Sequence, residues 1–282
     1  MNTTTPVRNV DDRTVAGFGR EWDAFKQNNV DPQELAAQFD AYFSVFRWEL
    51  VDGGSVGFDM GCGSGRWAKL LAPRVGKLVC IDASGEALAV ARSNLSHVSN
   101  VEFIHASVDA VPLRERSMDF GISLGVLHHV PNTTAAIRSC AALLKPGAPL
   151  LLYLYYRFDN RPAWFRAVWR MSDLVRRFVA DLPFGFKRVI TEVIAGTIYF
   201  PLARGAWLAE RLGADVTNFP LSAYRASSYY SMRTDALDRF GTRLEQRFTR
   251  VEIEQMLTAA GCKEIAFSDR SPFWVVCAVK SG

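Results

Sequence analysis

The chain has 282 residues, of which 49% are hydrophobic and 22% are charged, as in an ordinary globular protein with a full core. Its formal net charge of +4 is too small to require nucleic acid or another acidic partner. Its five cysteines form no C-x-x-C pair, so we expect no disulfide framework, zinc site or other metal site, and we predict a cytoplasmic location.

The N-terminal region, residues 1–54, is predicted to form a helical cap. It begins with a polar segment that lacks the apolar run of a signal peptide. Apolar residues then recur at three- and four-residue spacing from Ala36 to Phe46, which indicates an amphipathic helix, and Asp31-Pro32 is typical of a helix start. This cap could pack permanently on the protein or act as a flap over a ligand. No stretch of about 20 apolar residues occurs in the chain, so no membrane-spanning helix is expected.

From residue 55 onward, strands and helices alternate. Apolar runs predict strands at 56–60, 77–82, 101–105, 118–124 and 149–155, and helices between them at 67–72, 84–95 and 133–144. Nearly continuous apolar strands separated by helices predict a parallel sheet covered on both faces. Because crossovers are right-handed, the expected fold is a doubly wound α/β fold.

The segment 248–282 returns to this pattern. Thr249 and Glu252 have the spacing of a capping box at the start of a helix. Two further strands are expected after this helix, at 263–268 and 273–280. The closing hairpin would complete a mainly parallel, seven-stranded sheet in a core made of residues 55–155 and 248–282.

The segment between these two parts of the core, residues 156–247, breaks the alternation. It contains 15 Lys and Arg residues against 9 Asp and Glu residues, and it is rich in aromatic residues. We expect two helices, 162–182 and 187–212, with the second interrupted at Pro201. Because doubly wound folds bind ligands at the carboxyl edge of the sheet, we predict that the segment is a lid that holds the substrate. Peripheral membrane contact and a homodimer interface are alternatives for the same apolar and basic residues.

Three glycines, Gly61, Gly63 and Gly65, lie between the first core strand and its helix. Glycine permits positive φ and lets a ligand approach the backbone. Nicotinamide enzymes use the spacing G-x-G-x-x-G, in which the turn holds a pyrophosphate. Here the glycines alternate, and the carboxylate of Asp59 would repel a pyrophosphate but suits a cationic ligand. Asp82, at the end of the second strand, could accept hydrogen bonds from both hydroxyls of a ribose.

Six short segments occur in an order and spacing that one enzyme family shares. They are FDMGCGSG (58–65), CID (80–82), SVDAVPL (107–113), MDF (118–120), VLHHV (126–130) and LKPG (144–147). With them, the chain resembles the class I S-adenosylmethionine-dependent methyltransferases, whose reversed last strand is similar to the predicted final hairpin. The resemblance implies S-adenosyl-L-methionine as the cofactor.

The resemblance also implies a role for each matching position. The glycine turn, with Cys62, would lie against the methionine and ribose parts of the cofactor. Asp59 would act on the ammonium group, directly or through water, and Asp82 would hold the ribose hydroxyls. Further cofactor contacts are implied at Ala83, Ser107, Val108, Leu124 and Gly125. Phe18 and Trp22 lie in a segment similar to one that closes over the cofactor in some relatives.

Two histidines, His128 and His129, follow the strand 118–124. An unperturbed histidine pKa near 6.5 suits removal of a proton from a hydroxyl or an amine at neutral pH. In relatives the second histidine of this pattern points into the pocket more often, so the resemblance implies His129 as the first candidate base and His128 as the second. Either could instead be a packed loop residue.

The sequence therefore predicts an enzyme that transfers a methyl group from S-adenosylmethionine to a small molecule. Oxygen is the first acceptor considered, on a sugar, lipid-linked or secondary-metabolite substrate, and nitrogen is the second. The candidate substrate contacts are Tyr155, Tyr156, Arg157, Tyr229 and Tyr230. No nucleic-acid partner is expected, because Gly125–His128 replaces the Asn/Asp-Pro-Pro-Tyr type of motif found in base methyltransferases. Lipid or quinone methylation at a membrane surface and a non-catalytic cofactor-binding protein are the alternatives.

Overall fold

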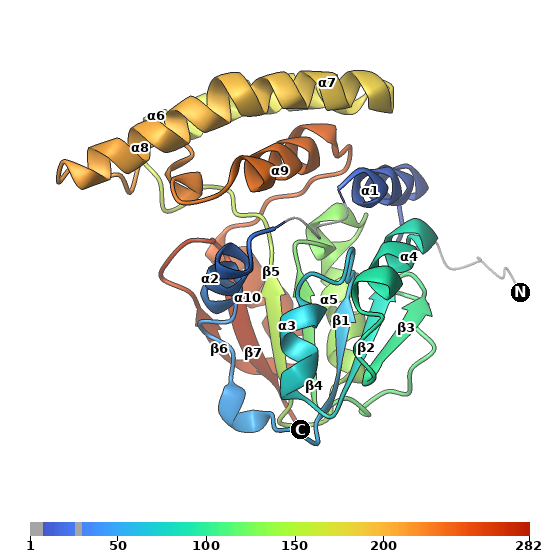
Figure 1. Ribbon diagram of the computed structural model, residues 1–282. Helices are drawn as coiled ribbons and strands as arrows, with labels where there is room; N and C mark the ends of the chain where they lie inside the picture. Colours follow the sequence, from blue (N-terminus) through green and yellow to red (C-terminus); the bar gives the residue numbers. More distant parts are fainter. Residues whose placement is uncertain (1–7, 26–29) are drawn as a thin grey trace, which may run out of the picture.

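The computed structural model describes residues 8–25 and 30–282, and its centre is a seven-stranded sheet (Figure 1). The strands are β1 (Val56–Met60), β2 (Lys77–Asp82), β3 (Val101–His105), β4 (Phe120–Leu124), β5 (Pro149–Tyr153), β6 (Cys262–Phe267) and β7 (Val275–Lys280). They lie in the order β3-β2-β1-β4-β5-β7-β6. Strands β1 to β5 pair in parallel, whereas β7 is antiparallel to β5 and β6. The predicted doubly wound, mainly parallel fold is confirmed.

The bounds of β1, β2 and β3 are those predicted, but β4 and β5 are shorter. β4 begins at Phe120, because Met118 makes only an isolated bridge to Leu144. β5 ends at Tyr153, because the chain then leaves the sheet, and the carbonyl of Tyr155 accepts a hydrogen bond from the amide of Phe248. The two ends of the segment 156–247 therefore lie side by side.

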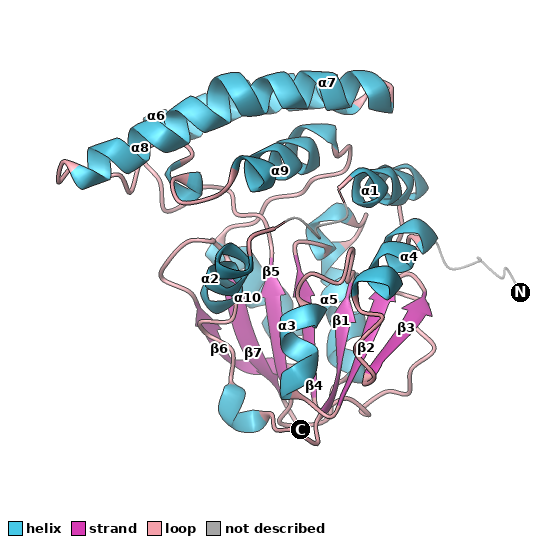
Figure 2. Cartoon of the chain, viewed as in Figure 1, coloured by secondary structure: helices cyan, strands magenta, loops and turns pink. Residues whose placement is uncertain are grey.

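Helices cover both faces of the sheet (Figure 2). They are α2 (Pro32–Tyr42), α3 (Ala68–Leu71) and α4 (Gly85–Asn94) on one face, and α5 (Thr133–Leu143) and α10 (Arg250–Ala259) on the other. In β2, Leu78 and Cys80 pack toward the first face, while Val79 and Ile81 pack toward the second. Burial on both faces explains why the strands read as nearly continuous apolar runs.

The N-terminal region contains α1 (Asp12–Ala24) and α2, followed by the short 3-10 helix Trp48–Leu50. Asp31 caps α2, because its carboxylate accepts hydrogen bonds from the amides of Gln33 and Glu34, and Pro32 is the first helical residue as predicted. In Figure 1, α1 lies above the carboxyl edge of the sheet, whereas α2 packs against the first face.

The segment 156–247 is mainly helical. Its helices are α6 (Ala163–Ala180), α7 (Phe184–Ile194), α8 (Phe200–Arg211) and α9 (Tyr229–Gly241). In Figure 1, α9 lies between the sheet edge and an outer layer formed by α6 and the long α7–α8 rod. The helices share a small core of their own, which includes Tyr199, Met232 and Phe240. The sequence patterns did not predict α9.

The expected interruption at Pro201 is wrong, because α7 and α8 form one continuous rod. A π-helical segment, Ala195–Tyr199, joins α7 to α8, in which Pro201 is the second residue. Proline has no amide hydrogen and ordinarily breaks a helix. The wider turn before Pro201 accommodates the missing hydrogen bond while the helix axis continues. Within the described residues, no helix combines the length and the apolar character needed to cross a bilayer.

Candidate active site

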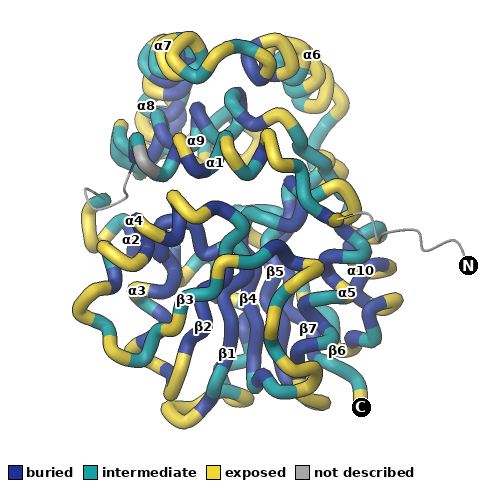
Figure 3. Tube along the Cα trace, turned by 90° about the vertical axis from the view of Figure 1, so that its right-hand side faces the viewer, coloured by how far each residue is buried: buried dark blue, intermediate teal, exposed yellow. Residues whose placement is uncertain are grey.

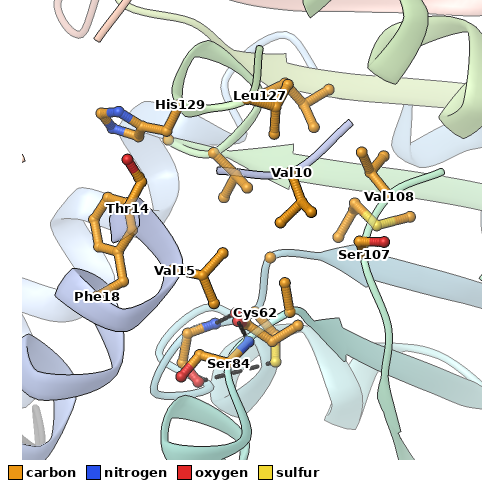
Figure 4. A pocket seen from close by; sticks show the side chains of 18 of the residues that line it. Val10, Thr14, Val15, Phe18, Cys62, Ser84, Ser107, Val108, Leu127 and His129 are labelled. Atoms are coloured by element: carbon orange, nitrogen blue, oxygen red, sulfur yellow. Dashed lines mark hydrogen bonds between the residues drawn. The ribbon is translucent and has the colours of Figure 1, made fainter. Parts of the chain in front are cut away.

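A cavity with an empty volume of about 970 Å³ opens at the carboxyl edge of the sheet, between the loops that follow β1, β2, β3 and β4. The strand order reverses between β1 and β4, so the connections after these two strands diverge and leave a crevice there. Helix α1 closes the crevice from above, and its side chains Thr14, Val15 and Phe18 point toward the loops of the sheet (Figure 4).

The glycine turn forms the floor of this cavity. Gly61, Gly63 and Gly65 have φ values of 77°, 53° and 76°, in the left-handed region that glycine enters freely. The amides of Gly61 and Cys62 donate to the carbonyl of Ile81, at 2.7 Å and 3.0 Å, which ties the turn to β2. A Cβ on Gly63 would lie 3.1 Å from the indole nitrogen of Trp22, so the turn and α1 approach each other closely.

Asp82 lies at the end of β2 and lines the cavity. Its two carboxylate oxygens accept hydrogen bonds from the amides of Gly63, at 2.9 Å, and Ser84, at 2.8 Å. Burial raises the pKa of Asp82, although these backbone donors oppose the shift. Because each carboxylate oxygen can accept more than one hydrogen bond, Asp82 keeps acceptor capacity for a ligand.

Asp59 lies in β1 and does not line the cavity, unlike its neighbours Met60 and Gly61. It is 1% exposed, and its Oδ2 atom has no hydrogen-bond partner. Burial, followed by the nearby charge of Asp82, raises the pKa of Asp59 to about 7. The geometry therefore places Asp59 behind the glycine turn, where it can act on a cavity ligand only indirectly.

The remaining predicted cofactor contacts line the same cavity. They are Phe18, Trp22, Cys62, Ala83, Ser107, Val108, Leu124 and Gly125. The sequence patterns missed Asn9, which also lines the cavity and holds the N-terminal segment in place there. Its amide donates to Asp109 Oδ2 at 2.8 Å, and its side chain exchanges hydrogen bonds with the backbone of Asn132.

His129 lines the cavity on the side of α1 and is 5% exposed (Figure 4). Its Nδ1 atom lies 2.7 Å from the carbonyl oxygen of Leu244. A carbonyl can only accept, so Nδ1 donates the hydrogen bond, and in the neutral form of the ring the unshared electron pair is on Nε2. Nε2 is buried and has no hydrogen-bond partner, while the ring packs edge-on against Phe18. In this tautomer Nε2 is the ring atom that can accept a proton.

His128 is fully buried and does not line the cavity. Its ring stacks on Tyr155 with centroids 3.8 Å apart, and neither ring nitrogen has a hydrogen-bond partner. Burial, followed by the charges of His129 and Arg247, keeps the pKa of His128 well below its usual value. His128 is thus a neutral packing residue beside the candidate base, which fits the packed-loop alternative for this position.

The five candidate substrate contacts lie outside the cofactor cavity. Tyr155 is nearest, because its hydroxyl donates to Asp238 at 2.5 Å and its ring centroid lies 5.6 Å from that of His129. Arg157 is exposed and pairs with a carboxylate of α10, and the ring of Tyr156 packs among aromatic side chains next to β7.

The other two candidates, Tyr229 and Tyr230, begin α9. The Tyr229 hydroxyl donates to Glu192 at 3.0 Å, and the ring of Tyr230 packs edge-on against Phe25. Substrate contact by any of these five side chains stays a prediction.

A group of carboxylates between α1 and α9 was also missed. Glu21 is 4% exposed, and its Oε1 atom has no partner. Burial, followed by Asp238 and Asp235, raises the pKa of Glu21 well above its usual value. Burial also raises the pKa of Asp235 to about 6, against the attraction of Arg66. Asp235 and Asp238 share one face of α9 by their spacing, but only the folded chain brings Glu21 to them.

A second cavity, with an empty volume of about 1010 Å³, lies between α1 and the helices α6, α7 and α9. Glu21 and four basic side chains, Arg13, Arg20, Lys187 and Arg243, are part of its wall. Thr14 lines both cavities, so the two spaces adjoin along α1.

The first cavity fits the cofactor that the sequence resemblance implies. Asp82 retains acceptor capacity for a pair of hydroxyls, and Gly61 and Gly63 line the cavity without a side chain that would keep a ligand from the backbone. Apolar surface for an adenine ring is present at Ala83 and Val108, beside the polar group of Ser107. These residues would hold S-adenosylmethionine, which supplies an activated methyl group when it is bound.

Comparison with known proteins supports the same conclusion. Residues 58–152 match the methyltransferase domain family. A ubiquinone biosynthesis O-methyltransferase from Xanthomonas axonopodis pv. citri (strain 306) is 35% identical over 218 residues, covering 71% of this chain and 88% of the relative. One with the same name from Sodalis glossinidius (strain morsitans) is 30% identical over 173 residues, covering 51% and 67%.

Solved structures share the fold. A SAM-dependent methyltransferase from Thermotoga maritima, described as a possible histamine N-methyltransferase, matches with a TM-score of 0.50 at 14% identity, covering 95% of this chain and all of that chain. This likeness shows the fold alone, whereas the Xanthomonas relative shows the family. The chain therefore belongs to the class I S-adenosylmethionine-dependent methyltransferases, and S-adenosylmethionine is its cofactor.

Proposed function

We propose that this methyltransferase acts on a hydroxyl oxygen of a small molecule, with His129 as the general base. The observation that carries the proposal is the fixed tautomer of His129. The Leu244 carbonyl keeps the proton on Nδ1, so Nε2 faces its buried surroundings with an unshared electron pair. A hydroxyl must lose its proton when it becomes an ether, and a base at this position can remove it.

Residues around His129 favour the charged ring that forms when the base takes the proton. Asp238 lies within electrostatic range of His129 and is held by the hydroxyl of Tyr155. A nearby negative charge stabilises an imidazolium. Helix α1, with Phe18 and Trp22, covers the cavity and would keep water from the reacting groups.

In this proposal the core binds the cofactor through the residues of the first cavity. Asp82 accepts from the ribose hydroxyls, and Ala83 and Val108 contact the adenine, whose edge meets Ser107 and the Val108 amide. The turn with Gly61, Cys62 and Gly63, together with Leu124 and Gly125, holds the methionine part, and Asp59 acts on the ammonium group through water.

In this proposal the acceptor reaches His129 in the first cavity from the side of the second cavity, which shares Thr14 with the first. The wall of the second cavity carries four basic and three acidic side chains, which suits an acceptor with several hydroxyl or other polar groups, such as a sugar, a lipid-linked compound or a secondary metabolite. The names of the bacterial relatives, ubiquinone biosynthesis O-methyltransferases, support oxygen as the acceptor atom. The segment 156–247 would then form the lid and one wall of the acceptor site, and the region 1–54 would form the cap.

Nitrogen is the second candidate acceptor, and one observation favours it. Glu21, Asp235 and Asp238 bring three carboxylates together, and an amine would find opposite charge there. A panel of phenols, sugars and amines, assayed with S-adenosylmethionine labelled in the methyl group, separates the two candidates. Absence of transfer to every compound in a cell extract would support the non-catalytic alternative.

The substitution His129→Gln tests the base directly. Turnover should fall about 100-fold or more, as is typical when a general base is removed, while S-adenosylmethionine affinity stays within about twofold. The matched control is His97→Gln, because His97 is exposed and lies outside both cavities. Unchanged turnover of His129→Gln on a hydroxyl acceptor would show that His129 is not the base.

A further inference from the structure

The outer surface of α6, α7 and α8 is covered with exposed apolar side chains, although the chain provides a full core elsewhere. Among the described residues, every exposed large hydrophobic side chain except Leu50, Tyr229 and Val251 lies on these helices or directly after them. They are Trp164, Val168, Met171, Leu174, Val175, Phe178, Phe186, Val189, Val193, Ile198, Phe200, Trp207, Leu208 and Leu212. We call this set the outer apolar face.

The outer apolar face is continuous along each helix. On α6, the exposed residues from Trp164 to Phe178 recur at three- and four-residue spacing, which places them in one stripe. Met171, Leu174 and Phe178 are about 70% exposed, at 70%, 68% and 68%. A contiguous apolar surface of this kind marks a site of interaction in a protein that dissolves in water.

The opposite sides of the same helices are already occupied. Val179 of α6, Ile194 of α7 and Ala203 of α8 are buried in the small core shared with α9. Figure 3 shows exposed parts of α6 and α7 at the end of the molecule farthest from the sheet. Because the inward sides are filled, the outer apolar face cannot be covered by a rotation of these helices.

Charge distinguishes between a lipid surface and a second copy of the chain. Helices α6, α7 and α8 carry eight Lys and Arg residues against three Asp and Glu residues. The exposed basic residues are Arg166, Arg170, Arg177, Arg188 and Arg211. Asp173, Glu192 and Glu210 already pair with arginines of the same chain, which leaves the balance positive. Two copies packed through this face would bring like charges together, whereas an anionic bilayer would meet opposite charge.

We propose that the outer apolar face binds the surface of a membrane rich in anionic lipids, with α6 and the α7–α8 rod lying in the plane of the interface. Apolar side chains enter the boundary between headgroups and acyl chains, and the arginines contact the lipid phosphates. Trp164 and Trp207 are at the same end of the antiparallel pair, and Trp suits this interfacial depth.

Vesicle co-sedimentation tests the proposal with the full chain. The probes are vesicles of phosphatidylcholine alone and vesicles of equal parts phosphatidylcholine and phosphatidylglycerol. We expect binding to the anionic vesicles that is at least about tenfold stronger than to the neutral ones and that weakens with added salt. Equal binding to both kinds of vesicle would overturn the role of the arginines, and no binding to either would overturn the proposal.

The double variant Met171→Asp/Phe178→Asp should weaken binding to anionic vesicles by at least about tenfold, because it places two charges in the outer apolar face. The control is Val251→Asp, which changes a side chain that is 61% exposed on α10, outside this face. Circular dichroism and S-adenosylmethionine affinity, measured for each variant, distinguish a lost surface from a lost fold. The variant Arg166→Glu/Arg170→Glu, which leaves the apolar side chains in place, provides a second measurement of the same face.

Light scattering without vesicles tests the competing occupant. We expect one chain per particle. A dimer that the double variant dissociates, together with no vesicle binding, would show that the outer apolar face is a subunit interface instead. Methyl transfer to a water-soluble acceptor does not depend on this face, so failure of the membrane proposal and failure of the proposed function give different results.

Discussion

The sheet core and the segment 156–247 hold their buried charges in different ways. Asp82 of the core is fixed by backbone amides that its own strand and the glycine turn supply. Asp235 and Asp238 lie on one helix of the segment, and their surroundings come from distant parts of the chain, including Glu21 and Arg66. The first arrangement follows from local backbone geometry, whereas the second exists only when α1, α9 and the sheet come together.

His129 lies where these two regions meet. The core supplies its backbone and the cavity that it lines, and the segment 156–247 supplies the Leu244 carbonyl that sets its tautomer. Apart from His129 itself, we therefore expect substitutions in the core to change stability and cofactor affinity, and substitutions in the segment to change turnover. Variants of single carboxylates in each region test whether the two regions affect different measured properties.

The largest effect in this comparison is expected from Asp59→Asn, through the pH dependence of folding. The pKa of Asp59 is about 7 in the folded chain against an ordinary value of 3.8, so the folded state binds more protons than the unfolded state between these values. Stability should therefore fall as the pH rises through this interval. Asparagine carries no charge, so the variant should gain stability relative to the unsubstituted protein, by up to about 4 kcal/mol at pH 8 and little at pH 4.

Urea unfolding without cofactor, at pH 4 and pH 8, measures this difference. The contrasting control is Asp52→Asn. The Gly54 amide and the Ser55 hydroxyl lower the pKa of the Asp52 carboxyl, so its contribution is lost only as the pH falls. A stability difference between Asp59→Asn and the unsubstituted protein that stays constant with pH would contradict the raised pKa of Asp59.

The next effect is expected from Asp82→Ala, which removes the predicted contact to the ribose. S-adenosylmethionine affinity should fall at least about tenfold, equivalent to about 1.4 kcal/mol, because charge-assisted hydrogen bonds are lost. Isothermal titration measures it, with Asp215→Ala on the exposed side of the segment 156–247 as the control. Affinity equal to that of the unsubstituted protein would remove the ribose assignment.

The contrast between the two regions also explains what could be predicted from the sequence. Strands β1, β2 and β3 were predicted to the residue, because apolar runs with glycine and polar ends are local signals. The position of the glycine turn and of Asp82 in the cavity could also be predicted, because the turn follows β1 directly and Asp82 is the last residue of β2. The capping box of Thr249 and Glu252 is confirmed and is equally local.

What could not be predicted depends on contacts between distant residues. The buried residues of helix α9 include the polar Ser231 and Thr234 beside Met232, Leu237 and Phe240, so its sequence lacks a clean apolar stripe. The tautomer of His129 depends on a carbonyl 115 positions away in the chain. At Pro201 the usual rule for a helix break was wrong, because the π-helical turn before it belongs to a helix packed on α9.

The smallest effect is expected from Asp238→Asn, which tests the contribution of the segment 156–247 to the chemistry. Asparagine keeps an oxygen that can accept from the Tyr155 hydroxyl but removes the charge that favours protonated His129. Turnover should fall by about threefold to tenfold, with S-adenosylmethionine affinity unchanged, because the variant alters only the surroundings of the base. The control is Asp173→Asn, in the same segment but paired with Arg176 and Arg177. If Asp238→Asn weakened cofactor affinity as much as Asp82→Ala does, the segment 156–247 would contribute to cofactor binding as the core does, and the assignment of separate roles to the two regions would be wrong.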